Sequence, residues 1–372
     1  IDTSAGTILH SNGRSADAHY LLSRCGTVYS KIVRLWGVKN NFQTKTSRVF
    51  ITKESGDKMV KNISVIGAGV MGHAIAAEFA MYGHRVALFD QAKTVRDAAP
   101  DRIAKDLQFM VDNGFISAER RKSTLGNLRV CGSLEEAGRD AHFVVEAIAE
   151  IAIVKAELFG TLDTICSPET IFCTNTSSLS LDSIIGRLPL ERRQRCIVCH
   201  YFNPANIIPC IELSLFGDTT QEPSDATAEL YRSVHKHPIR ILKDVPGMVG
   251  NRLQLTLYRE AAYLLDQGVT TASDLDECLK YGPAFRYAAI GMLGSYDMNG
   301  LSLTRHVADN IWPHLCNATD TTGGIIEEMD KQGKDGIRSG EGYFQYPAGQ
   351  EEWIRAENTR KLLMQLQAST NY

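Results

Sequence analysis

A histidine and a glutamate near the middle of the chain have the residue types that proton transfer requires. His200 ends the short stretch "CIVCH", and Glu212 lies in the apolar stretch "IIPCIEL", which follows the Asn203-Pro204 turn. A carboxylate buried beside an imidazole raises the proton affinity of the ring and fixes its tautomer, as a general base requires. A lone core histidine is ordinarily structural, but a glutamate among apolar neighbours is costly to bury without a partner. We therefore predict that His200 and Glu212 form a catalytic pair on adjacent strands.

The same histidine ends a C-x-x-C-H pattern, which is also the attachment signature of a c-type haem. That chemistry needs both thiols to reach one porphyrin, normally in an exported chain. Cys196 and Cys199 lie three residues apart on a predicted strand, so their side chains point to opposite faces. The proton-transfer interpretation is therefore favoured over haem attachment.

A glycine-rich turn, "VIGAGVMG", provides a second candidate site. Gly67, Gly69 and Gly72 form the pattern G-x-G-x-x-G after an apolar strand and at the start of a helix. This arrangement allows a tight turn, close backbone approach to a pyrophosphate and an anion at the helix N-terminus. Asp90 ends the next predicted strand, where a carboxylate binds the adenosine ribose hydroxyls and repels a 2′-phosphate. The pattern predicts NAD as the cofactor, in preference to NADP.

Four other polar residues allow two interpretations each. Glu150 and Lys155, in "VVEAIAEIAIVKAELF", follow a strand near the predicted cofactor crevice, but their spacing favours an exposed helix pair. Ser177, in "NTSSLSLDSI", also follows a strand, and by itself it is best interpreted as a helix N-cap. Asn251 lies on the apolar stripe of a predicted helix, so its amide needs a partner, which is either backbone, a substrate or the His200 site.

The elements that position these residues follow an α/β pattern from Met59 to about residue 242. Short apolar runs alternate with helical ones, which favours a parallel sheet with helices on its faces. The pattern changes at "KDVPGMVGNRL", because Pro246 and Gly247 disfavour a strand and a helical period begins. We expect the first of these helices to have a buried stripe formed by Leu255, Tyr258, Ala262 and Leu265. The prediction is an α/β Rossmann-type NAD-binding domain at residues 59–243 and an all-α domain at 244–372, after a poorly ordered leader at 1–58.

The composition excludes several classes of partner. The 372 residues include 40 basic and 43 acidic ones, and the formal charge is −3. This balance provides no field for nucleic acid or an anionic membrane. We predict no metal site, and the cysteines in apolar stretches indicate a reducing compartment. We expect a cytoplasmic protein whose leader is translated upstream sequence, because Met59 directly precedes the first predicted strand. The alternative is a mitochondrial transit peptide, which the basic excess of the leader weakly indicates.

Several motifs in order resemble the L-3-hydroxyacyl-CoA dehydrogenase family, from about residue 61 to residue 345. They are "VIGAGVMG", "VVEAIAE", "NTSSL", "HYFNP", "KHPIRILKDVPGMVGNR" and "SGEGYFQYP". The family includes λ-crystallin, an L-gulonate 3-dehydrogenase, and the carnitine dehydrogenases. The resemblance implies a Rossmann-type NAD domain and a helical domain that forms a homodimer.

The resemblance also implies a role for each candidate residue. It assigns His200 as the base with Glu212 as its partner, and it assigns Ser177 and Asn251 to the substrate oxygen. It makes Glu150 and Lys155 cofactor contacts, which reverses the interpretation from spacing.

One segment departs from the pattern of the acyl-CoA enzymes. "FRYAAIGML" is more similar to the λ-crystallin and carnitine dehydrogenase branches, and Gly282 and Gly291 mark its surroundings as a loop. A guanidinium at Arg286 matches a free carboxylate with two parallel hydrogen bonds. The alternatives are that Arg286 stacks on Phe285 or Tyr287, or forms a pair across a dimer interface.

The predicted function is NAD-dependent oxidation of the 3-hydroxyl of a 3-hydroxy acid or 3-hydroxyacyl-CoA to the 3-oxo compound. One alternative is a 6-phosphogluconate-type β-hydroxyacid dehydrogenase, which uses a lysine base at the start of its helical domain, where this chain has "GMVGNRLQ". Another is a crystallin-like structural protein that retains the NAD site.

Overall fold

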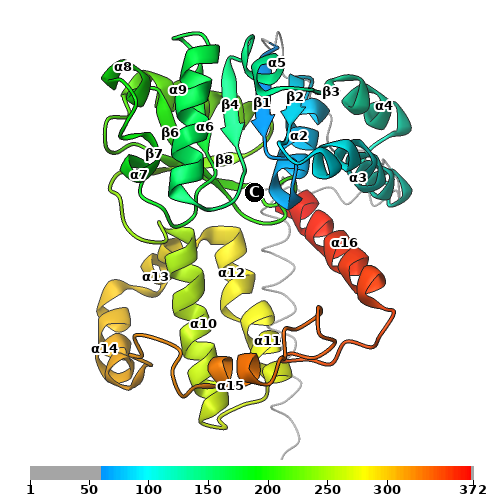
Figure 1. Cartoon of the computed structure of the whole chain (residues 1–372). Helices are drawn as coiled ribbons and strands as arrows, with labels where there is room; N and C mark the ends of the chain where they lie inside the picture. Colours follow the sequence, from blue (N-terminus) through cyan, green and yellow to red (C-terminus); the bar gives the residue numbers. More distant parts are fainter. Residues whose placement is uncertain (1–59, 370–372) are drawn as a thin grey trace, which may run out of the picture. The chain divides into compact units, whose positions relative to one another are not determined.

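The computed structural model describes residues 60–369, and the predicted leader lies outside them. A single eight-stranded sheet, in the order β3-β2-β1-β4-β5-β6-β7-β8, forms the centre of the N-terminal part (Figure 1). The strands are β1 Asn62–Ile66, β2 Arg85–Phe89, β3 Leu128–Val130, β4 Phe143–Glu146, β5 Ile171–Thr174, β6 Cys196–Tyr201, β7 Cys210–Ser214 and β8 His237–Ile241.

The first six strands are parallel to one another. β7 runs antiparallel to β6, and β8 runs parallel to β7 at the sheet edge. Pro238 occurs in this edge strand, where its missing N–H disturbs the ladder least. Because the order reverses beside β1, the carboxyl ends of β1 and β4 flank the crevice where such sheets bind ligands.

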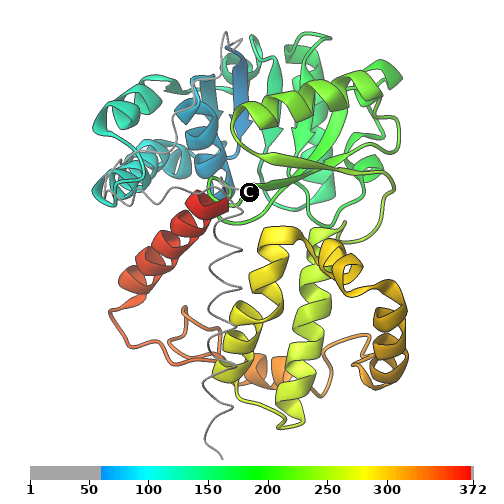
Figure 2. The same ribbon diagram turned by 180° about the vertical axis from the view of Figure 1, so that it is seen from behind.

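Helices cover both faces of this sheet (Figures 1 and 2). Their bounds are α2 Val70–Met81, α3 Lys93–Asp112, α4 Ala118–Gly126, α5 Leu134–Gly138, α6 Ala152–Ile165, α7 Leu181–Ile185, α8 Leu190–Arg193 and α9 Gln221–Ser233. One core cluster joins the strands to α2, α3 and α9, and a second joins them to α5, α6 and α7. Cys199 belongs to the first cluster and Cys196 to the second, which confirms that the two thiols point to opposite faces.

The chain after the sheet is helical, as predicted. It forms α10 Gly250–Asp266, α11 Ala272–Tyr281, α12 Pro283–Ile290, α13 Met292–Asn299, α14 Leu301–Ile311, the 3-10 helix η1 Trp312–His314, α15 Ile325–Lys331 and α16 Glu351–Ser369. α16 packs on the first core cluster of the sheet through the buried Leu363. In the described residues we find no helix with the length and apolar character of a membrane span.

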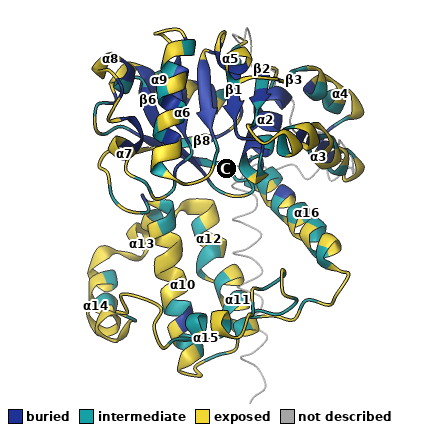
Figure 3. Ribbon diagram, in the orientation of Figure 1, coloured by how far each residue is buried: buried dark blue, intermediate teal, exposed yellow. Residues whose placement is uncertain are grey.

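The predicted buried stripe of α10 is wrong for the single chain. Leu255 is 57% exposed and Tyr258 is 39% exposed, whereas Ala262 is buried. Between residues 250 and 346, Ala262 and Ser295 alone are buried. Figure 3 shows α10 to α15 coloured mainly as exposed or intermediate. The apolar periodicity is real, but among the residues that the structure describes most of this face stays exposed.

Candidate active site

The glycine-rich turn between β1 and α2 depends on two of its glycines for its shape. Gly67 has a φ of +102°, and a Cβ on it would lie 2.4 Å from the carbonyl oxygen of Ala147. A Cβ on Gly72 would lie 1.8 Å from the carbonyl oxygen of Gly67. A Cβ on Gly69, the N-cap of α2, would have no protein atom within 4 Å. The turn therefore leaves open space at the N-terminus of α2, as the approach of a pyrophosphate requires.

Asp90 lies directly after β2 and braces this turn. Its Oδ2 accepts a hydrogen bond of 2.8 Å from the backbone N–H of Ala68, and its Oδ1 accepts one from the backbone N–H of Ala92. The first turn of α2 contains no acidic residue that would oppose an anion. These residues fit a dinucleotide with an unsubstituted ribose.

His200 and Glu212 face each other across β6 and β7, which confirms their predicted placement on adjacent strands. His200 Nδ1 lies 2.7 Å from Glu212 Oε2. His200 is 5% exposed and Glu212 is fully buried. With Nδ1–H donating to the carboxylate, Nε2 keeps its lone pair and is free to accept a proton.

The second oxygen of Glu212 binds the start of α10. Glu212 Oε1 accepts hydrogen bonds of 2.9 Å from the backbone N–H groups of Val249 and Gly250. Burial opposes ionisation of Glu212, but the bonds from His200, Gly250 and Val249 outweigh it and hold the pKa of Glu212 below its usual range. Glu212 therefore orients the histidine and ties the first helix of the helical domain to the sheet.

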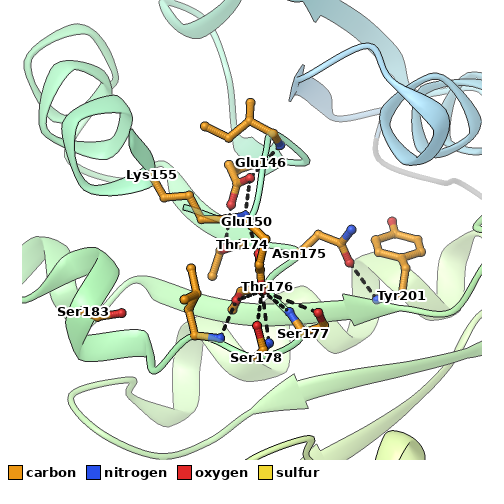
Figure 4. A network of polar contacts seen from close by, with 12 residues as sticks. Glu146, Glu150, Lys155, Thr174, Asn175, Thr176, Ser177, Ser178, Ser183 and Tyr201 are labelled. Carbon is orange, nitrogen blue, oxygen red and sulfur yellow. Dashed lines mark hydrogen bonds and ion pairs between the residues drawn. The ribbon is translucent and has the colours of Figure 1, made fainter. Parts of the chain in front are cut away.

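Ser177 lies in a turn that Glu150 organises (Figure 4). Glu150 Oε1 accepts hydrogen bonds from the Thr176 hydroxyl at 2.6 Å and from the backbone N–H groups of Ser177 and Ser178 at 2.9 and 3.0 Å. The N-cap interpretation of Ser177 is wrong, because Ser180 caps α7.

Glu150 is ionised at any ordinary pH. Burial raises its pKa, but the Thr176 hydroxyl, the backbone N–H of Ser177, the Lys155 ammonium and the backbone N–H of Ser178 together lower the pKa of Glu150 to about 2. A permanent carboxylate thus holds the turn that carries Ser177.

The predicted exposed helix pair of Glu150 and Lys155 is wrong. Glu150 precedes α6, and Lys155 is 1% exposed. Lys155 Nζ lies 2.7 Å from Glu146 Oε1 and 3.2 Å from Glu150 Oε2. Glu146 is absent from the residues singled out in the sequence; the signal that was available is a glutamate that ends the otherwise apolar strand "FVVE".

Asn251 and Ser177 line two cavities that share a wall. Asn251 is half-buried in the first turn of α10 and lines a cavity of about 900 Å³. Ser177 lines a cavity of about 240 Å³. Pro246 and Gly247 contribute to both cavities, whereas His200 lines neither.

Arg286 lies on a helix and not in the expected loop. It belongs to α12, and Gly282 and Gly291 are the caps of that helix. Its side chain is exposed, with its guanidinium carbon 5.7 Å from the ring centre of Tyr287, and it lines neither of the two cavities. This placement is that of the stacked alternative. No group of three or more potential metal ligands occurs in the part of the chain that the structure describes.

The sheet, its glycine-rich turn and the adjacent acidic residue define the class: a dinucleotide-binding α/β protein with a helical C-terminal domain. Residues 62–245 match the family described as "3-hydroxyacyl-CoA dehydrogenase, NAD binding domain", and residues 247–346 match the "C-terminal domain" of the same enzymes. The chain therefore belongs to the 3-hydroxyacyl-CoA dehydrogenase family, as the motifs predicted, and its cofactor is NAD.

Two relatives and one solved structure illustrate the similarity. The chain is 32% identical to 5-formyl-3-hydroxy-2-methylpyridine 4-carboxylate 5-dehydrogenase of Mesorhizobium japonicum, over 82% of this chain and 97% of the relative. It is 30% identical to human mitochondrial hydroxyacyl-coenzyme A dehydrogenase, over 83% and 99%. The crystal structure of a dehydrogenase for the same pyridine acid, described as an NAD⁺-dependent dismutase, matches with a TM-score of 0.75 and 30% identity over 84% of this chain and 99% of that one.

Proposed function

We propose that the protein oxidises the 3-hydroxyl of a 3-hydroxy acid or its CoA thioester to the 3-oxo compound, reversibly. The observation that carries this proposal is the buried pair of His200 and Glu212, which leaves the histidine Nε2 as a base. NAD, when bound, supplies the acceptor for the hydride from carbon 3.

The side chains divide the remaining work. His200 takes the hydroxyl proton at Nε2, and Glu212 stabilises the imidazolium that forms. Ser177 and Asn251 hold the substrate oxygen. α10 contains no lysine, so the lysine base of the 6-phosphogluconate-type alternative has no counterpart there.

The cofactor contacts follow from the shape of the turn. The pyrophosphate approaches the N-terminus of α2 beside Gly69, where the structure leaves open space, while Gly67 and Gly72 keep the turn tight. Asp90 accepts hydrogen bonds from the adenosine ribose, which selects NAD over NADP.

The substrate class has two members because the relatives name both. A relative that is 30% identical over 69% of this chain is named L-carnitine dehydrogenase, and carnitine is a free 3-hydroxy acid, whereas the human enzyme is named for hydroxyacyl-coenzyme A. The test is NADH formation, followed by absorbance, with L-3-hydroxybutyryl-CoA, L-carnitine, L-gulonate and L-3-hydroxybutyrate.

His200→Ala should lower the turnover of the best substrate by about 10²–10⁴-fold. The matched control is His237→Ala, at an exposed histidine on β8, which should leave turnover unchanged. A folded His200→Ala variant with near-native turnover would refute the mechanism.

We also propose that the helical domain forms a homodimer. Twelve of its large apolar side chains are at least 45% exposed on α10 and α12 to η1: Leu253, Leu255, Leu257, Phe285, Ile290, Leu293, Met298, Leu301, Leu303, Val307, Ile311 and Trp312. Two buried residues are too few to form a core for residues 250–346, so a second copy supplies it. Leu303→Glu should produce a monomer in sedimentation, whereas Leu190→Glu, at a 47% exposed position on α8, should not. A wild-type chain that sediments as a monomer would refute this proposal.

A further inference from the structure

We propose that Phe202 is a positioning residue: its ring fixes the spacing between the base, His200, and the first turn of α10, which carries Asn251. This inference rests on the proposed roles of His200 and Asn251 in the oxidation. Phe202 directly follows β6 and is half-buried. Because its ring contacts both elements, it does not need to touch substrate or cofactor to have this effect.

The ring of Phe202 lies against the imidazole of His200. The two ring centres are 5.0 Å apart and the ring planes are inclined by 63°, which is the edge-to-face arrangement that aromatic pairs favour. Glu212 holds the same imidazole through its Nδ1. The carboxylate therefore fixes one nitrogen of the imidazole, and Phe202 limits how far the imidazole can tilt about that hydrogen bond.

The far end of the Phe202 ring lies against Gly250, the first residue of α10. A Cβ on Gly250 would lie 2.2 Å from Phe202 Cζ and 2.7 Å from Phe202 Cε1. Gly250 does not have a positive φ, so the site needs a glycine for space and not for backbone conformation. The backbone N–H of Gly250 binds Glu212, and Asn251 is the next residue. The start of α10 is therefore held at one residue by both Phe202 and Glu212.

The backbone on both sides of Phe202 is also fixed. The backbone N–H of Tyr201 donates a hydrogen bond of 2.9 Å to Asn175 Oδ1. The buried ammonium of Lys236 donates hydrogen bonds to two carbonyl oxygens in the turn at residues 205–208. Because the backbone is held in this way, a group that pushes on the Phe202 ring must turn the ring away from the imidazole.

His200 and the start of α10 are therefore joined by two links, a polar one through Glu212 and an apolar one through Phe202. One carboxylate alone permits rotation about its side-chain bonds, whereas two links define both a distance and an orientation. Proton transfer from a hydroxyl held by Asn251 depends on that distance, because a displacement of about 1 Å can cost about 10²-fold in rate.

The test is a double-mutant cycle with Phe202→Leu and Gly250→Ala. Phe202→Leu removes the ring and should lower kcat by about 10- to 100-fold, with little change in the KM for NAD. Gly250→Ala should cause a similar loss, because its Cβ displaces the ring. In the Phe202→Leu background the Cβ has room, so Gly250→Ala should change kcat by less than about twofold further.

Two results of this cycle overturn the proposal. If Gly250→Ala acts through the backbone N–H that binds Glu212, it will lower kcat equally in both backgrounds. If Phe202 only fills space, Phe202→Leu will lower the unfolding temperature and leave kcat native. The matched controls are Phe115→Leu, at a buried phenylalanine between α3 and α4, which should lower stability without lowering kcat, and Gly160→Ala on α6, where a Cβ would meet open space and kcat should not fall.

A spectroscopic measurement without substrate or cofactor decides whether the Phe202 ring is displaced. The ring current of Phe202 shifts the NMR signal of the His200 Cε1 proton, so this signal should move in Phe202→Leu and in Gly250→Ala. Gly250→Ala should leave the signal in place in the Phe202→Leu background.

A His200 signal that does not move in Gly250→Ala overturns the proposal, whether or not any substrate is turned over. Absence of NADH formation by the wild type with every proposed substrate overturns the proposed function instead. If Gly250→Ala does not fold, Phe202→Leu alone is decisive: an unmoved His200 signal or a native kcat overturns the positioning role.

Discussion

Glu212→Gln should separate the two tasks of this carboxylate, because an amide has only one acceptor oxygen. If that oxygen keeps the backbone N–H groups of Val249 and Gly250, the NH₂ group faces His200 Nδ1 and forces the proton onto Nε2. The ring is then no longer a base at Nε2. If the oxygen keeps His200 instead, the NH₂ group points at two backbone donors and α10 loses its attachment.

The magnitudes of the two outcomes follow from these contacts. Inversion of the tautomer removes general-base catalysis and should lower kcat by about 10²–10⁴-fold with little loss of stability. Detachment leaves two buried N–H groups without an acceptor, at about 1–3 kcal/mol each, so the free energy of unfolding should fall by about 2–6 kcal/mol.

The sign of the pH dependence distinguishes the second outcome. The pKa of Glu212 lies below its usual range, so its contribution to stability is present at neutral pH and is lost as the pH falls through the folded-state pKa. The difference in unfolding free energy between wild type and Glu212→Gln should therefore shrink on acidification.

The assays are kcat for the best substrate and urea unfolding at several pH values. The matched control is Glu169→Gln, at an 83% exposed glutamate beside Arg195, which should change stability by less than about 1 kcal/mol. A folded Glu212→Gln variant with native kcat and native stability would refute the reasoning.

Three further substitutions test the cofactor site and the core. Gly72→Ala should destabilise the fold because its Cβ would lie 1.8 Å from the Gly67 carbonyl oxygen, whereas Gly69→Ala should leave thermal stability unchanged and weaken NAD binding in titrations. Asp90→Ala should raise the Kd of NAD more than that of NADP, and equal affinity of the wild type for both would contradict this. Burial raises the pKa of Glu78 to about 7 despite the lowering effect of Lys236, so its contribution to stability is present below about pH 4 and lost as the pH rises through about 7. In Glu78→Gln the unfolding temperature should therefore change less with pH between about 4 and 7 than in the wild type. The same pH dependence in both proteins would contradict the assignment.

The strands and the catalytic pair could be predicted because local patterns determine them. Buried parallel strands are mainly apolar, so "NISVI" and "CIVCHY" are visible in the sequence as strands. A polar residue that interrupts such a run, as Glu212 does, is then conspicuous. Its pairing with His200 follows from the adjacency of β6 and β7.

The contacts of Lys155 could not be predicted because they join three segments. Its distance from Glu150 in the sequence suits an exposed helix, but α6 starts only at Ala152 and its first turn faces the buried Glu146. The Lys155 ammonium is buried because β4 lies beside α6 in the folded chain, and the local spacing of polar and apolar residues does not predict this contact.

The segment around Arg286 shows the opposite error. Gly282 and Gly291 were interpreted as loop residues, but they are the caps that separate α12 from its neighbours. Glycine marks both situations, and only the length of the intervening run distinguishes them. The exposed face of α10 shows a third limit, because an apolar stripe looks the same in the sequence whether the helix packs in its own core or, as proposed above, against a second copy.

Glu212 and Glu150 solve one structural problem in the same way. Each directs one oxygen to a nitrogen-bearing side chain, His200 or Lys155, and the other to two consecutive backbone N–H groups of a different segment. Four acceptor directions on one charged group allow this, and no neutral side chain offers as many. Each carboxylate therefore links the position of a backbone segment to the orientation of a side chain: Glu212 links the start of α10 to His200, and Glu150 links the turn at Ser177 to Lys155. Substitutions on the two sides of either carboxylate should therefore be non-additive, whereas substitutions at Glu212 and Glu150 should be independent to the extent that the two groups share no partner.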